Sequence, residues 1–117
     1  MDSIKKSSDF ALVAKQGDKW FSDSFILQVL NREDHKEEDS RFGLIVSKKL
    51  GNAVARNFIK RRFREVVRLS FPKVIKGIDI VLIGRKTSKE RSLQQMQSDF
   101  RWSLKRLKII EGSKKLT

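Results

Sequence analysis

The sequence predicts a single small α+β domain, 1–117, an α-β-β-β-α-β-α sandwich in which helices pack against a mixed four-stranded sheet. Segments whose apolar residues recur every three to four positions alternate with shorter runs of Val, Ile, Leu and Phe, which indicates both helices and strands. A chain of 117 residues has room for one domain with its own core. Because it contains no cysteine, neither disulfides nor thiolate zinc sites are expected.

The N-terminal part is predicted to form a tail and one short helix. Residues 1–6 are expected to be a loose basic tail. A helix is predicted from about Asp9 to Gln16, with Ser7 or Ser8 as its N-cap and Gly17 as its stop. Its apolar residues occupy more than one side, so this helix is expected to bury more than one face.

Two strands are predicted to follow. Trp20 and Phe21 indicate a short first strand, and a longer strand is predicted to end at Leu30. In the longer strand, both the face that carries Leu27 and the face that carries Gln28 contain apolar residues. The longer strand is therefore expected to be covered on both sides.

Residues 31–40 are polar and contain five acids, which predicts a solvated hairpin loop. A calcium loop is disfavoured, because the segment lacks both the defined order of ligands and the glycine that such a loop needs at its turn. His35, the only histidine, is expected to be exposed and is assigned no role. Since the carboxylates repel polyanions, the loop is predicted to point away from the basic residues that follow it.

Residues 41–47 predict a strand that leads into a strongly basic helix. Gly43 within this strand indicates a bulge or a close backbone approach. Residues 48–51 are predicted to turn the chain, and the helix is predicted to run from Asn52, its possible N-cap, to about Ser70.

The basic helix is predicted to be apolar on one side and cationic on the other. Like charges four residues apart destabilise a helix by roughly 0.2 to 0.5 kcal/mol per pair, so the cationic side is interpreted as a polyanion-binding face, with a solvated surface of no function as the alternative. Arginine predominates, which favours a folded nucleic acid over a membrane surface. Arg62 projects near the apolar side and is expected to pack its stem and keep its charge in water. The apolar stripe consists of Ala55, Ile59, Phe63 and Val66, and the opposite side of Asn57, Lys60, Arg61, Arg64 and Arg68.

The C-terminal third predicts a buried strand and a last helix. Residues 78–84 are almost all apolar, which is typical of a strand buried on both faces. Strand, helix and strand in this order suggest a parallel crossover, which is normally right-handed. After a polar connector at 85–91, Ser92 and Gln95 predict a capping box for the last helix, and residues 112–117 are expected to be disordered.

The net charge of +13 and an isoelectric point near 10.4 imply a negatively charged partner and salt-dependent binding. No apolar run approaches the roughly 18 residues of a membrane span, and the N-terminus has no apolar signal core. A soluble, cytoplasmic protein without membrane contact is therefore expected.

The segment from Gly43 to Arg64 resembles the signature of the bacterial ribonuclease P protein subunit, and weaker similarity extends from about Ile4 to Leu107. The resemblance implies a left-handed crossover in place of the usual right-handed one. The residues that carry it are Gly43, Val46, Ser47, Lys48, Lys49, Gly51, Asn52, Ala53, Val54, Arg56, Asn57, Lys60, Arg61 and Arg64.

The resemblance implies a subunit of ribonuclease P, the endoribonuclease that removes the 5′ leader from precursor tRNA. In that family a catalytic RNA performs the chemistry with Mg²⁺, so neither a catalytic residue nor a metal site is expected on this chain. The implied partners are the catalytic RNA and precursor tRNA, with no DNA. The RNA-binding residues that it implies are Lys48, Lys49, Arg56, Asn57, Lys60, Arg61, Arg64 and Arg68.

The resemblance also implies a cleft for the leader between the first helix and the sheet, formed by Phe10, Val13, Gln28 and Ser47. For Phe10, the alternative is an ordinary core aromatic. Ala14 stands where the family often has a second aromatic residue, and Gln28 where a tyrosine is found. The cleft is thus expected to have lost surface for base stacking and to bind the leader more weakly.

Two other functions remain open from the residues themselves. A structural RNA-binding protein of the ribosomal type would use the same basic helix without any role in cleavage. A protein nuclease acting alone would need convergent carboxylates for metal ions, whereas the largest group of acids, five of fourteen, lies in the polar residues 31–40 beside no basic pocket. Trp102 lies opposite the apolar stripe of the last helix and is assigned no role.

Overall fold

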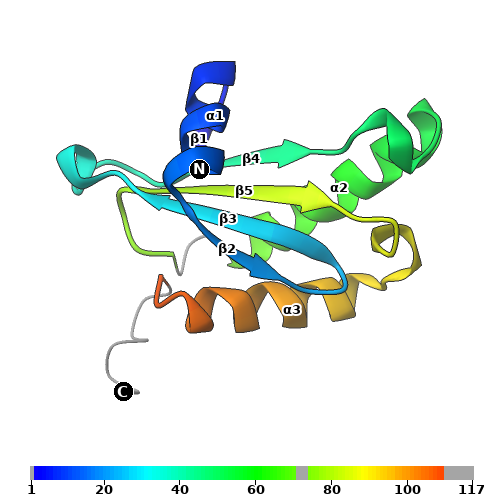
Figure 1. The fold of residues 1–117 in the computed structure, drawn as a ribbon. Coiled ribbons are helices and arrows are strands. Elements are labelled where there is room, and N and C mark those ends of the chain that lie inside the picture. The colour runs from blue at the N-terminus through cyan, green and yellow to red at the C-terminus, as the bar shows by residue number, and fades with distance from the viewer. Residues whose placement is uncertain (1, 71–73, 110–117) are drawn as a thin grey trace.

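The protein, a computed structural model in which residues 2–70 and 74–109 are described, is a mixed β-sheet flanked by helices (Figure 1). Four strands make up most of the sheet, and a two-residue strand, β1, extends it beyond β4 in the order β1-β4-β5-β3-β2. The predicted α+β class and mixed four-stranded sheet are confirmed. The strands are β1 (Asp2–Ser3), β2 (Asp18–Phe21), β3 (Phe25–Asn31), β4 (Arg41–Ile45) and β5 (Ile78–Gly84).

β5 is the central strand of this sheet. It pairs antiparallel with β3 and parallel with β4, and its first five residues are buried. The expectation of a hairpin loop at residues 31–40 is therefore wrong, because β5 separates β3 from β4. These residues instead connect two strands that do not pair, and they include the short 3₁₀ helix η1 (Glu33–His35). The apolar β5 takes the inner position because burial between two strands and two helical layers removes most of its surface from water.

Helices cover the two faces of the sheet unequally. α1 (Ser7–Gln16) lies on one face, and α2 (Ala53–Ser70) and α3 (Leu93–Arg106) pack together on the other (Figure 1). Phe25 of β3 contacts Phe63 of α2 and Phe100 of α3 edge to face, with ring centroids 5.7 and 6.0 Å apart. All three rings are fully buried, so the main core lies between the sheet and the predicted apolar stripes of α2 and α3.

β4, α2 and β5 form the crossover unit. In Figure 1 both strands run from left to right, β4 lies above β5, and α2 passes behind the sheet, which is the left-handed arrangement. This crossover places the start of α2 at one end of the sheet and the acidic residues of η1 at the other (Figure 1). The acidic loop therefore points away from the start of the basic helix, as predicted.

Within the segment 1–6, which was expected to be a loose tail, residues 2–4 pair with the sheet. Asp2 and Ser3 pair in parallel with the first residues of β4. The Ile4 N–H donates to the Phe42 carbonyl at 2.8 Å, and the Ile4 side chain is buried. The Ile4 side chain is enough to hold this otherwise polar segment on the sheet, because it packs in the small apolar cluster between α1 and the sheet. The expected tail at 112–117 lies outside the described residues.

The predicted helix caps are partly confirmed. Asn52 accepts a hydrogen bond from the Ala55 N–H at 2.9 Å, and Ser92 and Gln95 form both bonds of the capping box. α1, however, begins earlier than expected with Lys6 at the N-cap position, so neither predicted serine caps it. None of the helices in the described part of the chain combines the length and the apolar composition that crossing a membrane requires.

Candidate nucleic-acid interface

The start of α2 is built by a tight turn after β4. β4 ends at Ile45, before the predicted Ser47, and the chain then passes through the 3₁₀ helix η2 (Lys48–Leu50). Gly51 has a φ of 136°, a left-handed value that residues with a side chain rarely adopt. Lys48 and Lys49 are exposed on this turn, close to the helix N-terminus, where free N–H groups add positive potential.

α2 has the two sides that the sequence predicted. Its buried side packs against the sheet and α3, and most of its cations lie on the opposite side. Asn57, Arg61, Arg64 and Arg68 are exposed, whereas Arg56 and Lys60 are half-buried. We call Lys48, Lys49 and these six residues of α2 the basic face.

The cations of the basic face differ in their pairing. Within residues 2–70 and 74–109, Lys60, Arg61 and Arg64 form no ion pair with an acid of the chain. Arg68, in contrast, donates two hydrogen bonds to Glu65, the shorter at 2.6 Å. This contact lowers the pKa of Glu65 and raises the pKa of Arg68, so both groups are charged at neutral pH. Most of the positive charge of α2 is therefore available to an external anion.

On the other side of the sheet, α1 packs through Val13 and Phe10. Val13 is fully buried in a cluster with Ile4 and Val81. The Phe10 ring lies directly over Gly43 of β4, where an added Cβ atom would come within 2.5 Å of it. The close approach predicted at Gly43 is confirmed, and the group that approaches is an aromatic ring.

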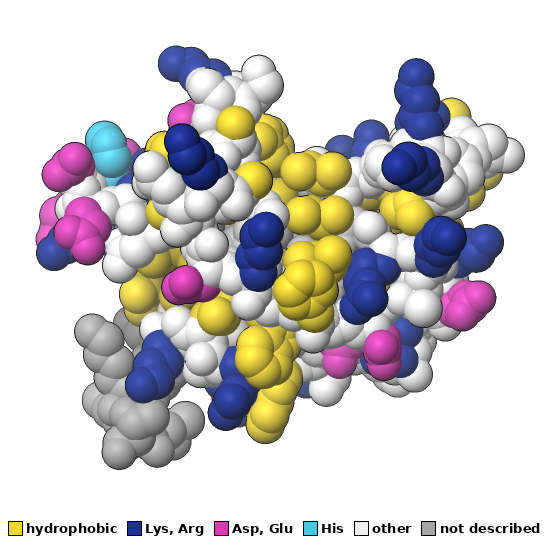
Figure 2. Space-filling view, in the orientation of Figure 1, with side chains coloured by type: hydrophobic (Ala, Val, Ile, Leu, Met, Phe, Trp, Pro, Cys, Tyr) yellow, Lys and Arg dark blue, Asp and Glu magenta, His cyan; other side chains and the backbone are white. Residues whose placement is uncertain are grey.

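A row of apolar side chains beside α1 is left uncovered. Phe21, Ile26, Ile83 and Ile45 are in register on the four neighbouring strands β2, β3, β5 and β4 and share the face on which α1 packs. Phe21 is 62% and Ile45 is 37% exposed. Figure 2 shows hydrophobic side chains in a column across these strands, with Lys and Arg side chains to either side. We call these four residues the apolar row.

The four residues predicted for a leader cleft divide into two kinds. Phe10 is half-buried and Ser47 is exposed, so both retain accessible surface. Val13 of α1 and Gln28 of β3 are 0% and 5% exposed and offer almost no surface to a ligand in this structure, so their place in a leader cleft stays a prediction. Among the described residues, the Gln28 Oε1 atom has no hydrogen-bond partner.

The apolar row was not predicted from the sequence, although the alternation of residues within β3 indicated one member of it. Ile26 alternates with Gln28 and therefore shares its face of the strand. Its partners could not be found in the same way, because the register that places Ile45 and Ile83 beside Ile26 joins segments far apart in the sequence.

A surface cavity of about 210 Å³ connects the α1 side of the sheet with the basic face. Phe10 lines it from α1 and Gly43 from β4, and Lys60 and Arg64 line it from α2. The basic face and the surface beside α1 thus meet around the β4 edge, which lets one extended polyanion contact both.

A buried carboxylate of β5 joins two arginines, one of which reaches α1. The Asp79 carboxylate of β5 is almost fully buried and accepts two hydrogen bonds from Arg41 at 3.0 and 2.7 Å. Arg32 approaches the same carboxylate at 2.9 Å, and Arg41 also contacts Asp9 of α1 at 3.4 Å. The hydrogen bonds that Arg41 donates to Asp79 raise the pKa of Arg41, which remains charged.

The residues that the structure describes contain no group of three or more His, Asp or Glu side chains that could hold a metal ion. The expectation that a catalytic RNA binds Mg²⁺ stays a prediction.

A family model described as Ribonuclease P matches residues 1–108. The chain belongs to the ribonuclease P protein family. The ribonuclease P protein component of Gluconacetobacter diazotrophicus is 39% identical over 104 residues, covering 88% of each chain, and that of Finegoldia magna is 37% identical, covering 81% of this chain and 80% of the relative. Among solved structures, the ribonuclease P protein of Staphylococcus aureus has a TM-score of 0.81 at 33% identity, covering 95% of this chain and 99% of the other. That of Thermotoga maritima has a TM-score of 0.77 at 30% identity, covering 96% and 100%.

Membership of the ribonuclease P protein family confirms the resemblance carried by Gly43 to Arg64. It also confirms the expectation of a subunit of the ribonuclease P holoenzyme, acting in tRNA processing. An RNA partner follows from that membership, and the cationic surface of α2 is consistent with one.

Proposed function

We propose that the chain holds the catalytic RNA of ribonuclease P on the basic face and the 5′ leader of precursor tRNA along Phe10 and the apolar row. The RNA, with Mg²⁺, then removes the leader to give the mature 5′ end of the tRNA. The observation that carries this proposal is the cavity at the β4 edge, lined by Phe10 from α1 and by Lys60 and Arg64 from α2. Because this cavity joins the two surfaces, one holoenzyme can hold the catalytic RNA and the precursor tRNA leader at the same time.

On the basic face, the catalytic RNA is bound mainly through its phosphates. Each neutralised phosphate releases counterions and adds about −0.7 to −0.9 to the slope of log K against log salt. Arginine presents a planar fork of donors to a phosphate, and Arg61 and Arg64 carry theirs without a competing acid among the described residues. Asn57 is uncharged and contributes hydrogen bonds, with little effect on that slope.

Along the apolar row, the leader binds as a single strand whose bases lie on hydrophobic surface. Stacking of a base on an aromatic side chain typically contributes about 1 to 3 kcal/mol. Phe21 offers an exposed ring at the β2 end of the row, and Phe10 offers a half-buried ring near the β4 edge. Between these two rings, each neighbouring strand contributes one apolar residue. Such a surface fits an extended single strand of RNA and does not select a particular base sequence.

The chain contributes affinity, and the chemistry is assigned to the RNA and its Mg²⁺. Several acids near the proposed surfaces are already engaged with arginines, as Glu65 is with Arg68 and Asp79 with Arg41. Cationic help matters most at physiological ionic strength, because high Mg²⁺ screens the repulsion between two RNAs without any protein.

Cleavage of precursor tRNA tests the whole proposal. A catalytic RNA transcript is assayed at physiological salt and low Mg²⁺, with and without the full chain, and the chain is assayed alone. We expect the chain to stimulate the transcript strongly and to cleave nothing by itself. Binding without stimulation would assign the chain to structural RNA binding of the ribosomal type, and cleavage by the chain alone would assign it to the nucleases.

A second experiment tests the apolar row by comparing precursor tRNA with leaderless tRNA. Phe21→Ala should weaken binding of the precursor to the holoenzyme by about 5- to 150-fold, the range of one lost stacking contact, and leave binding of leaderless tRNA unchanged. Trp102→Ala is the matched control, because Trp102 is an aromatic residue of similar exposure, 58% against 62%, on α3. Equal effects of the two variants on the precursor would contradict a leader site on the row.

A further inference from the structure

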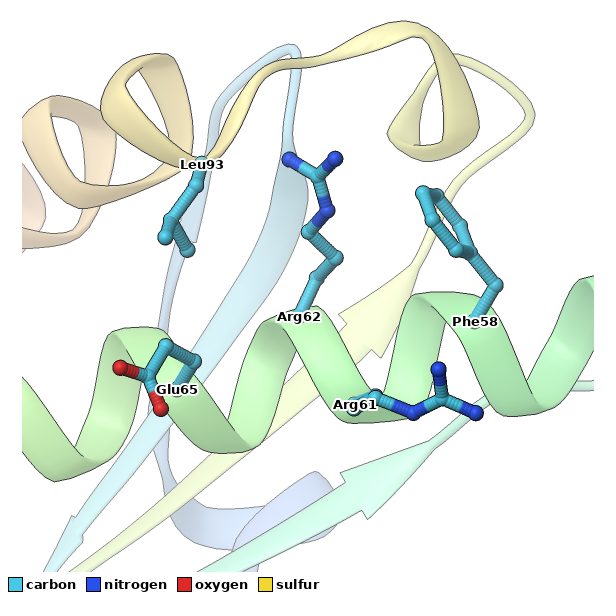
Figure 3. A pocket seen from close by; sticks show the side chains of 5 residues that line it. All are labelled: Phe58, Arg61, Arg62, Glu65 and Leu93. Carbon is cyan, nitrogen blue, oxygen red and sulfur yellow. The ribbon is translucent and has the colours of Figure 1, made fainter.

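A second cavity lies between α2 and the start of α3, away from the sheet face that carries the apolar row. It measures about 350 Å³ and is lined by Phe58, Arg61, Arg62, Glu65 and Leu93, at the small end of the range of ligand pockets. Figure 3 shows Arg62 and Phe58 rising side by side from α2 toward the chain that leads into α3, and Leu93 pointing down from α3. Phosphate-binding residues alone would not require such an aromatic and aliphatic lining.

The position of Arg62 creates a stacking surface in this pocket. Its guanidinium carbon lies 4.9 Å from the centre of the Phe58 ring, so its planar group is held on an aromatic ring and does not simply extend into water as the sequence suggested. Phe58 nevertheless remains 39% exposed. Both a guanidinium plane and an aromatic face stack readily on nucleobases.

The polar groups of the pocket select among the bases. Arg61 and Arg62 provide N–H donors. Both oxygens of the Glu65 carboxylate already accept a hydrogen bond from Arg68, and each retains a lone pair that can accept another. Guanine has acceptors at O6 and N7 and a donor amino group at N2, which complements donors on one side and a carboxylate on the other. Adenine lacks the O6 acceptor and carries its amino group at N6.

We propose that this pocket takes one unpaired guanine base of the catalytic RNA, stacked on Phe58 and Arg62 and hydrogen-bonded by Glu65. The proposal rests on the function proposed above, because the adjoining phosphates would be those held by Arg61 and its neighbours on α2. It adds base recognition to a helix whose other contacts are with phosphates.

Binding of the full chain to a ribonuclease P RNA transcript, measured over a range of salt, tests the stacking. Phe58→Leu keeps an apolar side chain and removes the ring, so affinity should fall by about 5- to 150-fold at every salt concentration. The slope against salt should not change, since no phosphate contact is lost. Leu69→Ala is the matched control, because Leu69 is an apolar residue of α2 with 45% exposure that does not line the pocket. The affinity of the Leu69→Ala variant for the transcript should be unchanged.

The Lys60→Ala/Arg64→Ala double variant separates this proposal from the proposed function, because both residues belong to the basic face and neither lines the pocket. If the double variant loses affinity and Phe58→Leu does not, the base pocket is refuted and the basic face stands. If neither variant loses affinity while both remain folded by urea unfolding, both ideas fail. A Phe58→Leu chain that binds RNA normally but no longer self-associates would assign the pocket to a second copy of the chain.

The identity of the base is tested with transcripts in which single guanosines are replaced by inosine, which lacks the amino group at N2. With the unaltered chain, we expect inosine at one unpaired position to weaken binding of the transcript. With Glu65→Gln, the same inosine should have no additional effect, because the carboxylate that accepted from the amino group is gone. Absence of any such position would overturn the guanine assignment.

Discussion

At the scale of single residues, the basic face of α2 contains cations of unequal availability. Arg61 is exposed and has no acidic partner among the described residues, whereas Arg68 is held by two hydrogen bonds to Glu65. A phosphate that binds Arg68 must compete with a carboxylate already in place. The two arginines therefore should not contribute equally, although their spacing along the helix makes them look equivalent.

Alanine variants of these two arginines measure the difference. Arg61→Ala should lower affinity for the catalytic RNA and flatten the slope of log K against log salt by about 0.7 to 0.9, as expected for one lost phosphate contact. Arg68→Ala should change both quantities less, because its charge is already compensated by Glu65. Titration of a labelled transcript at four or more salt concentrations gives both slopes. Indistinguishable slopes for the two variants would show that Glu65 does not compete.

Ala14 is a second single residue whose effect can be measured, because it stands where the family often has an aromatic residue. Ala14 is exposed on α1, one turn after Phe10, so an aromatic residue there extends the surface near the proposed leader site. Ala14→Phe should raise affinity for precursor tRNA by about 5-fold or more, as one added stacking contact predicts, with no change for leaderless tRNA. Leu12→Phe is the control, since Leu12 is also exposed on α1 but, two residues before Ala14, points to the opposite side of the helix. The measurement is holoenzyme binding to both tRNAs, and no gain for Ala14→Phe would remove the idea of lost stacking surface.

At the scale of elements, α1 is seated on the sheet by a ring-on-glycine contact. A Cβ atom on Gly43 would come within 2.5 Å of the Phe10 ring, and overpacking of this kind typically costs about 1 to 3 kcal/mol. Because Gly43 does not have a positive φ, the expected cost comes from the ring and not from backbone strain.

A double-mutant cycle isolates this contact. Gly43→Ala should lower the free energy of unfolding by about 1 to 3 kcal/mol and weaken leader-dependent binding as Phe10 is displaced. In a Phe10→Ala background the same substitution should cost much less, since the ring is gone. Urea unfolding of the four proteins gives the coupling energy. A cost at Gly43 that does not depend on Phe10 would refute the account of how α1 is held.

At the scale of the whole molecule, one buried carboxylate joins separate parts of the fold. Asp79 of β5 contacts Arg41 of β4 and Arg32 after β3, and Arg41 reaches Asp9 of α1. Removing one member of a buried ion pair leaves an uncompensated charge, with a typical cost of about 3 to 5 kcal/mol. The network thus joins β5, β4 and the segment that follows β3, and reaches α1 only through the longer, partly exposed contact between Arg41 and Asp9.

Asp79→Asn tests this network. The free energy of unfolding should fall by about 3 kcal/mol, the low end of the range, because Arg41 is partly exposed and water relieves some of its charge. Asp9→Asn is the matched control and should cost under about 1 kcal/mol, since its contact with Arg41 is long and partly exposed. Urea unfolding at constant ionic strength measures both. Equal costs would mean that Asp79 is not the centre of the network.

The sequence by itself determined the helices and strands, the two-sided character of α2 and the capping box of α3, because these depend on residues close together in the chain. It also determined the family, through motifs confined to β4, η2 and α2. Local periodicity suffices for such features, since neighbouring positions fall on one face of a helix or strand whatever the rest of the chain does.

Only the tertiary structure decided which distant residues share a surface. The insertion of β5 between β3 and β4 aligned Ile26, Ile83 and Ile45 into a row, and burial of Ile4 converted an expected tail into the edge of the sheet. The packing of α3 beside α2 brought Leu93 opposite Arg62 and formed a pocket. Strand register and helix packing depend on how much apolar surface many separate segments bury together. They therefore cannot be predicted from any single stretch of the sequence.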